Sequence, residues 1–387
     1  MSTGQTLGRR DSHFVDGLIP DYVRQFQAYV PSKPDRQLML EYGAPFLHRL
    51  NNNENALGAP PAARQVIADY PLNRLSIYPS GDAYDLRQAL ASRFDFDADR
   101  FLVGNGSCEV ITSIIKAFCE RGDNIVTADK TFAVYEWVAE FSGVEARLVP
   151  LLANAFDPEG MLARVDRRTK IVFVCNPNNP TGSYWSTDVL VDFLERAGER
   201  IVVIDEAYCE FVEQSDYPDA MHLMERFPNV VVFRTFSKMY ALASLRAGFL
   251  VGTAPVVDAV RRTSTTYSVN SLAQIAAQAA LADTTGHLTR SRALVREARE
   301  FLCKVCAELD LPVVSGEGNY LMIKVPINDT LMYRRLMRRG FMVRSMTGFR
   351  FPGWIRVTLG DAAVMAEFAD VLRTEILMLR QSAAKLI

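Results

Sequence analysis

The sequence has few of the residues that hold metals or form cross-links. Histidine occurs four times and cysteine six times among 387 residues, and no histidine lies in a motif. A zinc site or histidine-based catalysis is therefore not expected. The cysteines form no dense framework, which is typical of a reducing compartment and favours a cytoplasmic protein. Cys303 and Cys306 form a C-x-x-C pair, but the residues around them predict one long helix in which they pack into the core.

Long apolar runs and a strong net charge are also missing. No stretch approaches the roughly 18 apolar residues that cross a membrane, and residues 1–14 lack the apolar run of a secretory signal. Lysine and arginine (43) nearly balance aspartate and glutamate (45), so the formal charge is −2. This balance gives no reason to expect nucleic acid as a partner. An apolar content of 49 % is enough for a sizeable core in one or two domains.

Segments typical of strands and helices alternate through the middle of the chain. Apolar segments predict strands at 100–103, 124–128, 146–150, 170–175, 200–204, 229–234 and 248–251. Helical segments are expected between them, at 83–94, 108–121, 133–141, 187–197 and 272–281. Such alternation predicts an α/β fold with a largely parallel sheet that is covered by helices on both faces.

The two ends of the chain differ from this middle part. Residues 1–55 are expected to form an N-terminal arm with one short helix at 20–29. A large domain is expected at 56–285 and a smaller α+β C-terminal domain at 286–387. The pattern that predicts the smaller domain is a long helix, strands at 320–325 and 354–358, a helix at 331–339 and a closing helix from 362.

Polar motifs follow three of the predicted strands. They are Asn178–Gly182 (NNPTG), Asp205–Tyr208 (DEAY) and Arg234–Lys238 (RTFSK). Ligands of an open parallel sheet collect at the carboxyl ends of its strands, so these motifs are expected to meet at one site.

The last of these motifs suits a phosphorylated carbonyl compound. The hydroxyls of Thr235 and Ser237 and the guanidinium of Arg246 can hold a phosphate. Lys238 can condense with a carbonyl as a Schiff base. Taken alone, these residues are also typical of a solvated basic loop after a core strand. The other two motifs favour the site.

In this order, the motifs resemble those of fold-type I pyridoxal-phosphate (PLP) aminotransferases, and most closely those of the histidinol-phosphate aminotransferase family. The similarity extends from about Tyr29 to the last predicted helix. It implies PLP fold type I, in which a large domain has a mostly parallel seven-stranded sheet flanked by helices and a smaller α+β domain follows. It also implies PLP as the cofactor, Lys238 as the catalytic residue that carries it, and no metal.

The resemblance implies a role in PLP binding for further residues. Asp205 pairs with the protonated pyridine nitrogen, which keeps the ring able to accept electrons. Asn179 and Tyr208 hydrogen-bond to the 3-hydroxyl oxygen, and Phe132 stacks on the ring. The residues implied to contact the phosphate are Ser107, the backbone of Cys108 at a helix N-terminus, Thr235, Ser237, Arg246 and, from the neighbouring subunit of a homodimer, Tyr78.

Substrate contacts are implied as well. Arg356 matches the arginine that binds the substrate α-carboxylate, for which a guanidinium offers bidentate geometry. Tyr29 and Arg344 match residues that bind a substrate phosphate, and Asn55 lies in a loop that resembles the family's substrate-side loop. The expected reaction transfers an amino group between an L-amino acid or an amino alcohol phosphate, such as histidinol phosphate, and a 2-oxo acid such as 2-oxoglutarate.

Departures from the family pattern leave other substrates and reactions open. Cys108 stands where most relatives have an acid, Ser244 replaces a usual glycine, and Ala56 replaces a usual proline. A relative in a specialised pathway, whether a transaminase for another amino acid, a decarboxylase or a cyclase, would keep the same lysine and aspartate. A non-catalytic module with this fold is a third alternative, and the presence of Lys238 argues against it.

Overall fold

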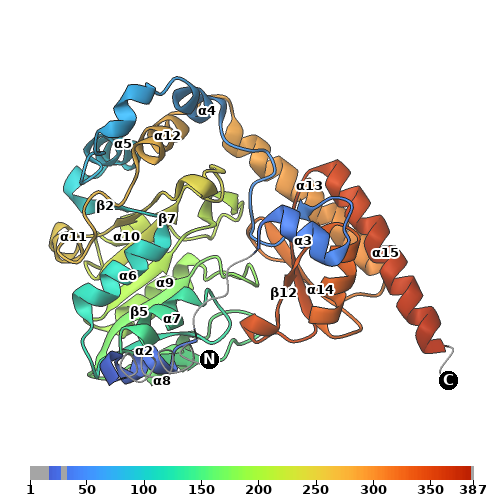
Figure 1. The fold of residues 1–387 in the computed structure, drawn as a ribbon. Helices are drawn as coiled ribbons and strands as arrows, with labels where there is room; N and C mark the ends of the chain where they lie inside the picture. The colour runs from blue at the N-terminus through green and yellow to red at the C-terminus, as the bar shows by residue number, and fades with distance from the viewer. Residues whose placement is uncertain (1–16, 28–32, 385–387) are drawn as a thin grey trace, which may run out of the picture.

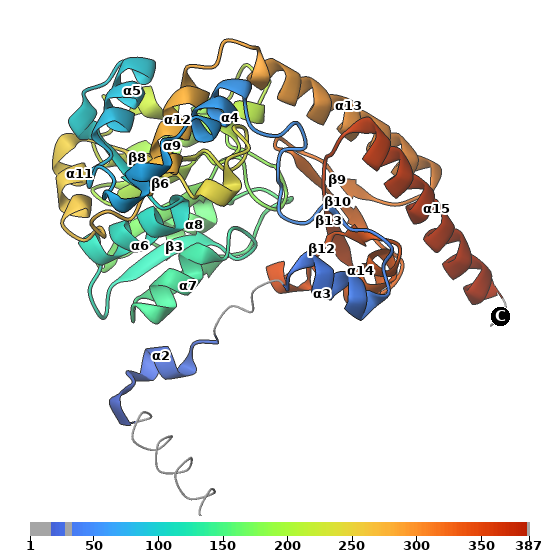
Figure 2. The same cartoon turned by 45° about the horizontal axis from the view of Figure 1, so that its top comes forward.

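The computed structural model describes residues 17–27 and 33–384. Figures 1 and 2 show a larger unit, which contains the main sheet, and a smaller C-terminal unit. The long helix α13 (His287–Glu308) runs from one unit to the other. Within the described ranges, no helix is both long and apolar enough to span a bilayer.

The main sheet contains all seven predicted strands, each within one residue of its expected limits. Its order is β2-β8-β7-β6-β5-β3-β4. β8 runs antiparallel to β2 and β7, and the other pairs are parallel. The mostly parallel seven-stranded sheet is therefore confirmed. The strands are β2 (Phe101–Gly104), β3 (Asn124–Ala128), β4 (Glu145–Val149), β5 (Thr169–Cys175), β6 (Ile201–Asp205), β7 (Val230–Thr235) and β8 (Gly248–Val251).

The central strands of the sheet are buried on both faces. The valine, isoleucine and phenylalanine side chains of residues 171–174, 202–204 and 230–233 are all within the core. Continuous apolar strands of this kind are typical of a parallel sheet that lies between two helical layers. In the register, Asp205 at the end of β6 lies opposite Cys175 and opposite Phe233. The three strands therefore end at one edge, where the polar motifs begin.

Helices pack around this sheet (Figure 1). All five predicted helices are present, although the one expected at 108–121 ends at Phe118 because Cys119 has extended backbone. Helices α4, α8, α10 and α11 were not predicted, because each is short and offers little periodicity. The helices are α4 (Pro61–Ala68), α5 (Tyr84–Phe94), α6 (Ser107–Phe118), α7 (Val134–Phe141), α8 (Pro158–Arg164), α9 (Thr187–Ala197), α10 (Ala220–Leu223), α11 (Ala254–Arg261) and α12 (Ser271–Leu281).

The C-terminal unit contains an antiparallel sheet of order β12-β13-β10-β9. The two predicted strands are β10 (Tyr320–Lys324) and β13 (Trp354–Thr358). The sequence did not reveal β9 (Val313–Val314) or β12 (Arg344–Ser345), because two residues show no alternation. The predicted helices appear as α14 (Asp329–Arg338) and α15 (Ala362–Ala384), and α15 packs on α13 (Figure 2).

Part of the N-terminal segment packs on this C-terminal unit. β1 (His48–Arg49) pairs in parallel with β11 (Phe341–Met342), and α3 (Asp35–Tyr42) contacts α14. Leu38 of α3 is buried in a small cluster with Met337 and Met342. The limits of the three domains stay a prediction.

The short helix expected at 20–29 corresponds to α2 (Asp21–Gln25) in its first half. Phe26, just after α2, packs edge to face against Phe141 of α7, with ring centroids 5.5 Å apart. Tyr29 lies outside the described residues.

Candidate active site

A cavity of about 630 Å³ lies where the two units meet at the carboxyl ends of β6 and β7. This volume is typical of a site for a small molecule. The cavity brings together most of the residues singled out in the sequence. They are Ser107, Cys108, Phe132, Asn179, Asp205, Tyr208, Thr235, Ser237, Lys238, Arg246, Arg344 and Arg356.

Lys238 follows β7 and lies beside the asparagine-rich loop that precedes α4. Its Nζ donates a hydrogen bond to the carbonyl oxygen of Asn52 at 2.6 Å and lies 5.8 Å from the ring centroid of Tyr208. Burial, together with the charges of Arg356 and Arg246, lowers the pKa of Lys238 to about 8. An appreciable fraction of the amine is therefore neutral near pH 7, as a nucleophile requires.

Asp205 is buried at the end of β6. Its Oδ2 accepts a hydrogen bond from the hydroxyl of Tyr135 at 2.5 Å, and its Oδ1 accepts one from the backbone N–H of Ala207 at 3.1 Å. Burial raises the pKa of Asp205 to about 6, and these two hydrogen bonds oppose the rise. The carboxyl group is thus ionised at pH 7 and can pair with a cationic nitrogen.

Tyr135 was missed in the sequence, although it lies on α7 three residues after Phe132. It is fully buried, and its ring stacks on Phe173 of β5 with centroids 4.7 Å apart. The stacking fixes the hydroxyl against Asp205. A single tyrosine in an apolar helix gives no sequence signal for this contact.

An anion-binding corner lies at the N-terminus of α6. Its N-cap is Gly106, which has no capping side chain and has φ of 74°. A Cβ there would lie 2.4 Å from Arg246 Nη2, so the guanidinium approaches the helix end closely. Unpaired N–H groups of a helix N-terminus and a guanidinium both favour an anion. Ser107, Thr235 and Ser237 add hydroxyl groups to the same cavity.

An ion pair joins two residues of the sequence motifs, Arg234 and Glu206. Arg234 donates from Nε and Nη2 to Oε2 of Glu206, at 2.8 and 2.7 Å. Glu206 follows Asp205 and is fully buried, and Arg234 precedes Thr235. The pair therefore links the ends of β6 and β7 next to the functional side chains.

Arg356 lies on β13 and is buried between two rings. Its Nη1 donates to Asn179 Oδ1, and its Nη2 donates to the carbonyl oxygen of Asn51 at 2.6 Å. Its Nε has no hydrogen-bond partner among the described residues. The guanidinium lies 5.5 Å from the ring centroid of Tyr320 and 5.6 Å from that of Phe349. A fixed, buried cation with an unused N–H is well suited to a carboxylate or phosphate.

Two predicted residues lie elsewhere in this chain. The Asn55 amide donates to the carbonyl oxygen of Met239 at 2.8 Å and to Ser291 Oγ at 2.9 Å. The second bond holds its loop to α13, and Asn55 does not line the cavity. Its substrate contact stays a prediction. Tyr78 is 80 % exposed, packs against Tyr267 and does not line the cavity either.

The neighbours of Asn55 line the cavity in its place. Asn52, Asn53 and Glu54 all face it. Asn53 Nδ2 donates to the hydroxyl of Tyr208 at 2.8 Å, and its backbone N–H donates to Thr358 Oγ1 at 2.9 Å. Asn53 thus ties the two units together beside Tyr208. The run of asparagines indicated a loop here without showing which amide reaches the site.

The cavity fits the parts of PLP. An amine with a lowered pKa, a buried carboxylate and a cationic corner at a helix end match its aldehyde, its pyridine nitrogen and its phosphate. Residues 47–372 match the family model described as aminotransferase class I and II. The chain belongs to this family, and it is an enzyme that transfers amino groups between amino acids and 2-oxo acids.

Similar proteins and structures within the aminotransferase family include several histidinol-phosphate aminotransferases. The chain is 37 % identical to histidinol-phosphate aminotransferase of Anaeromyxobacter sp., over 89 % of this chain and 94 % of that protein. It is 38 % identical to histidinol-phosphate aminotransferase 2 of Pseudomonas aeruginosa, over 87 % and 92 %. The crystal structure of histidinol-phosphate aminotransferase from Sinorhizobium meliloti, in complex with pyridoxal-5'-phosphate, aligns with a TM-score of 0.83 at 25 % identity and covers 93 % of this chain and 98 % of that one. The resemblance seen in the motifs is confirmed, and PLP is the cofactor.

Proposed function

We propose that this aminotransferase exchanges an amino group between histidinol phosphate and 2-oxoglutarate. The observation that carries the proposal is a pair of guanidinium groups that the C-terminal unit contributes to the cavity. Arg344 and Arg356 lie opposite each other in the β12–β13 register, and each lies 5.6 Å from the ring centroid of Phe349. Two cations match the charge of a phosphate monoester, and also the two carboxylates of 2-oxoglutarate. The names of the relatives support histidinol phosphate as the amino donor.

In this proposal the cavity residues hold the cofactor and move one proton. When bound, PLP supplies an electron sink for bond breaking at the substrate α-carbon. Lys238 would carry the cofactor, and its amine would take the proton from that carbon of the amino donor and, in the second half-reaction, give a proton to the corresponding carbon of the oxo acid. Asp205 keeps a proton on the pyridine nitrogen. The other contacts are Asn179 and Tyr208 with the 3-hydroxyl oxygen, Phe132 with the ring face, and Ser107, Cys108, Thr235, Ser237 and Arg246 with the phosphate.

Removing the phosphate from the substrate should cause a large loss of efficiency. Histidinol would leave the guanidinium of Arg344 without an anion, so kcat/KM for histidinol phosphate should exceed that for histidinol by on the order of 10³. Arg344→Ala should lower kcat/KM for histidinol phosphate by about 10- to 100-fold and leave that for histidinol nearly unchanged. Each half-reaction can be followed separately through the absorbance of the cofactor.

Arg338→Ala is the control for the loss of an arginine, because Arg338 is exposed on α14 outside the cavity. It should change neither specificity constant. Equal values for histidinol phosphate and histidinol in the wild type would contradict the proposed substrate and favour an enzyme of another pathway.

We also propose a homodimer in which Tyr78 reaches the cavity of the other subunit. Tyr78 belongs to an exposed apolar segment with Leu72, Leu75 and Ile77. Exposed apolar surface of this kind is typical of an interaction site. The partner is a second copy of the chain, and the tyrosine hydroxyl would complete the phosphate contacts there.

Mixing two inactive variants tests the shared site. Tyr78→Ala and Lys238→Ala should each be strongly impaired. In their heterodimer one site keeps both residues and the other has neither, so an equimolar mixture should recover up to about a quarter of wild-type activity. Lys238→Ala mixed with Asp205→Ala should recover nothing, because both residues line the cavity of their own chain. Sedimentation of the active enzyme as a monomer would contradict the dimer.

A further inference from the structure

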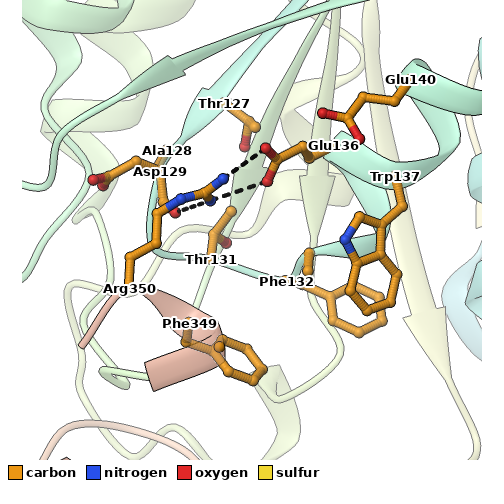
Figure 3. Close-up of a pocket in the computed structure, with 12 residues that line it drawn as sticks. Thr127, Ala128, Asp129, Thr131, Phe132, Glu136, Trp137, Glu140, Phe349 and Arg350 are labelled. Atoms are coloured by element: carbon orange, nitrogen blue, oxygen red, sulfur yellow. Dashed lines mark hydrogen bonds and ion pairs between the residues drawn. The ribbon is translucent and has the colours of Figure 1, made fainter. Parts of the chain in front are cut away.

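A second cavity, of about 160 Å³, lies beside the first and shares part of its wall. Figure 3 shows it between α7 of the large unit and a loop of the C-terminal unit that carries Phe349 and Arg350. Phe132, Trp137 and Phe349 line both cavities. Phe349 of this loop therefore contacts both the active-site cavity and the smaller cavity next to α7.

Arg350 at the tip of this loop binds the large unit. Its guanidinium donates two hydrogen bonds to the carboxylate of Glu136 on α7, at 2.7 and 3.0 Å, and one to the carbonyl oxygen of Asp129, at 2.8 Å (Figure 3). We call this set of three hydrogen bonds the clasp. The Glu136 side chain is 16 % exposed, so the clasp is partly shielded from solvent. It joins residues from the two units beside the active-site cavity.

The base of the loop is fixed on the C-terminal unit. Asp329, the first residue of α14, is buried and accepts hydrogen bonds from the backbone N–H of Thr347 at 2.9 Å, from its hydroxyl at 2.7 Å and from Gly353 N–H at 3.0 Å. Arg350 itself has φ of 60°, a left-handed conformation that a residue with a Cβ adopts at a cost. The clasp and Asp329 together hold the loop in this shape.

Phe349 is the residue whose place depends on Arg350. It precedes Arg350, and its ring lies 5.6 Å from the guanidinium carbon of both Arg344 and Arg356. An aromatic face attracts a cation and restricts where it can lie. If the loop tip moves, the contact between the ring and both guanidinium groups is lost.

We propose that Arg350 is a positioning residue for the substrate, because its clasp with Glu136 holds Phe349 beside Arg344 and Arg356, the two arginines proposed to bind the substrate anions. This inference rests on the proposed function and adds a specific residue pair to it. Arg350 acts through Phe349 rather than on the reacting atoms. The clasp also joins the two units beside the cavity.

Two single variants and a charge swap test the clasp. Arg350→Asn removes the guanidinium and keeps a side chain that tolerates positive φ, and Glu136→Gln removes the partner charge. Each should raise KM for both the amino donor and 2-oxoglutarate by about three- to fivefold, as expected for a partly exposed ion pair. The value of kcat and the dissociation constant of PLP should stay within twofold of wild type. The double variant Arg350→Glu with Glu136→Arg should recover most of the loss.

Arg196→Asn is the matched control. Arg196 makes a similar two-oxygen pair with Glu159 on the surface, and its side chain is 42 % exposed against 48 % for Arg350. This variant should change neither KM. Hydrogen exchange of residues 346–352, measured without substrate or cofactor, should be faster in Arg350→Asn and Glu136→Gln and unchanged in Arg196→Asn.

The outcomes separate this inference from the proposed function. A wild type that does not transaminate histidinol phosphate contradicts the proposed function. An active wild type with unchanged KM in both clasp variants contradicts the clasp alone. Raised KM without faster exchange means that Arg350 contacts substrate itself, which also overturns the positioning role. If Arg350→Asn does not fold, Glu136→Gln and the charge swap decide.

Discussion

Replacing Lys238 with alanine is expected to abolish transamination, with a loss in kcat on the order of 10⁴ or more. The variant loses both the amine that carries the cofactor and the base that moves the α-proton. PLP should still bind through the corner formed by Arg246 and the N-terminus of α6, so the dissociation constant of PLP should rise far less than kcat falls. Stopped-flow absorbance and equilibrium dialysis measure the two quantities separately.

The pKa of Lys238, lowered to about 8 by burial, predicts the pH dependence of cofactor uptake. An amine attacks a carbonyl only in its neutral form, so the rate constant for PLP uptake by cofactor-free protein should rise with pH below about 8 and level off above it. With an ordinary lysine, whose pKa is about 10.4, the rate constant would continue to rise up to about pH 10. Lys324→Ala, which removes an exposed lysine on β10, should leave this profile unchanged. Borohydride reduction that attached PLP to a lysine other than Lys238 would show that the proposed site is wrong.

Asp205→Ala should lower kcat by on the order of 10³, because the variant can no longer hold a proton on the pyridine nitrogen as charge develops at the substrate carbon. The dissociation constant of PLP should rise less, since phosphate contacts persist. Tyr135→Phe should have a smaller effect of the same sign. It removes the 2.5 Å hydrogen bond to Asp205 and so raises the pKa of that carboxyl group.

Glu375→Ala is the control for losing a buried carboxylate away from the cavity. Glu375 lies on α15 and pairs with Arg335 and Arg339 of the C-terminal unit. This variant should lower the melting temperature and leave kcat per folded protein unchanged. Turnover close to wild type in Asp205→Ala would show that another residue serves the pyridine nitrogen.

The main sheet could be predicted closely because its strands are short, apolar runs that end in polar motifs. Asp205 and Thr235 follow such runs, so the rule that ligands meet the carboxyl ends of parallel strands located both of them. The small strands β9 and β12 could not be predicted, because a strand of two residues is too short to show an alternation of apolar and polar side chains. Arg344 was found only through the family motif, and its place opposite Arg356 depends on the pairing of β12 with β13.

Contacts between distant side chains could not be predicted from the sequence. Tyr135 meets Asp205 because α7 packs against β3 and β4 and the Tyr135 ring stacks on Phe173 of β5. Arg350 meets Glu136 because the two units lie side by side here. The two residues of each pair lie on different secondary-structure elements, so no pattern within one segment of the sequence predicts the contact. The loop before α4 shows a related limit. The sequence did not reveal that Asn53 makes a hydrogen bond with Tyr208, because a loop has no periodicity that fixes which side chain faces the cavity.

The pairing of β1 with β11 also bears on the order in which the chain can fold. Residues 35–50 leave the ribosome early, yet the strand and helix against which they pack are among the last parts to be made. Leu38 must therefore wait for Met337 and Met342 before it is covered. Contacts this far apart in sequence slow folding and leave apolar surface open in the meantime. A fragment that begins at residue 51 is expected to aggregate, and adding residues 35–50 as a separate peptide should restore its solubility.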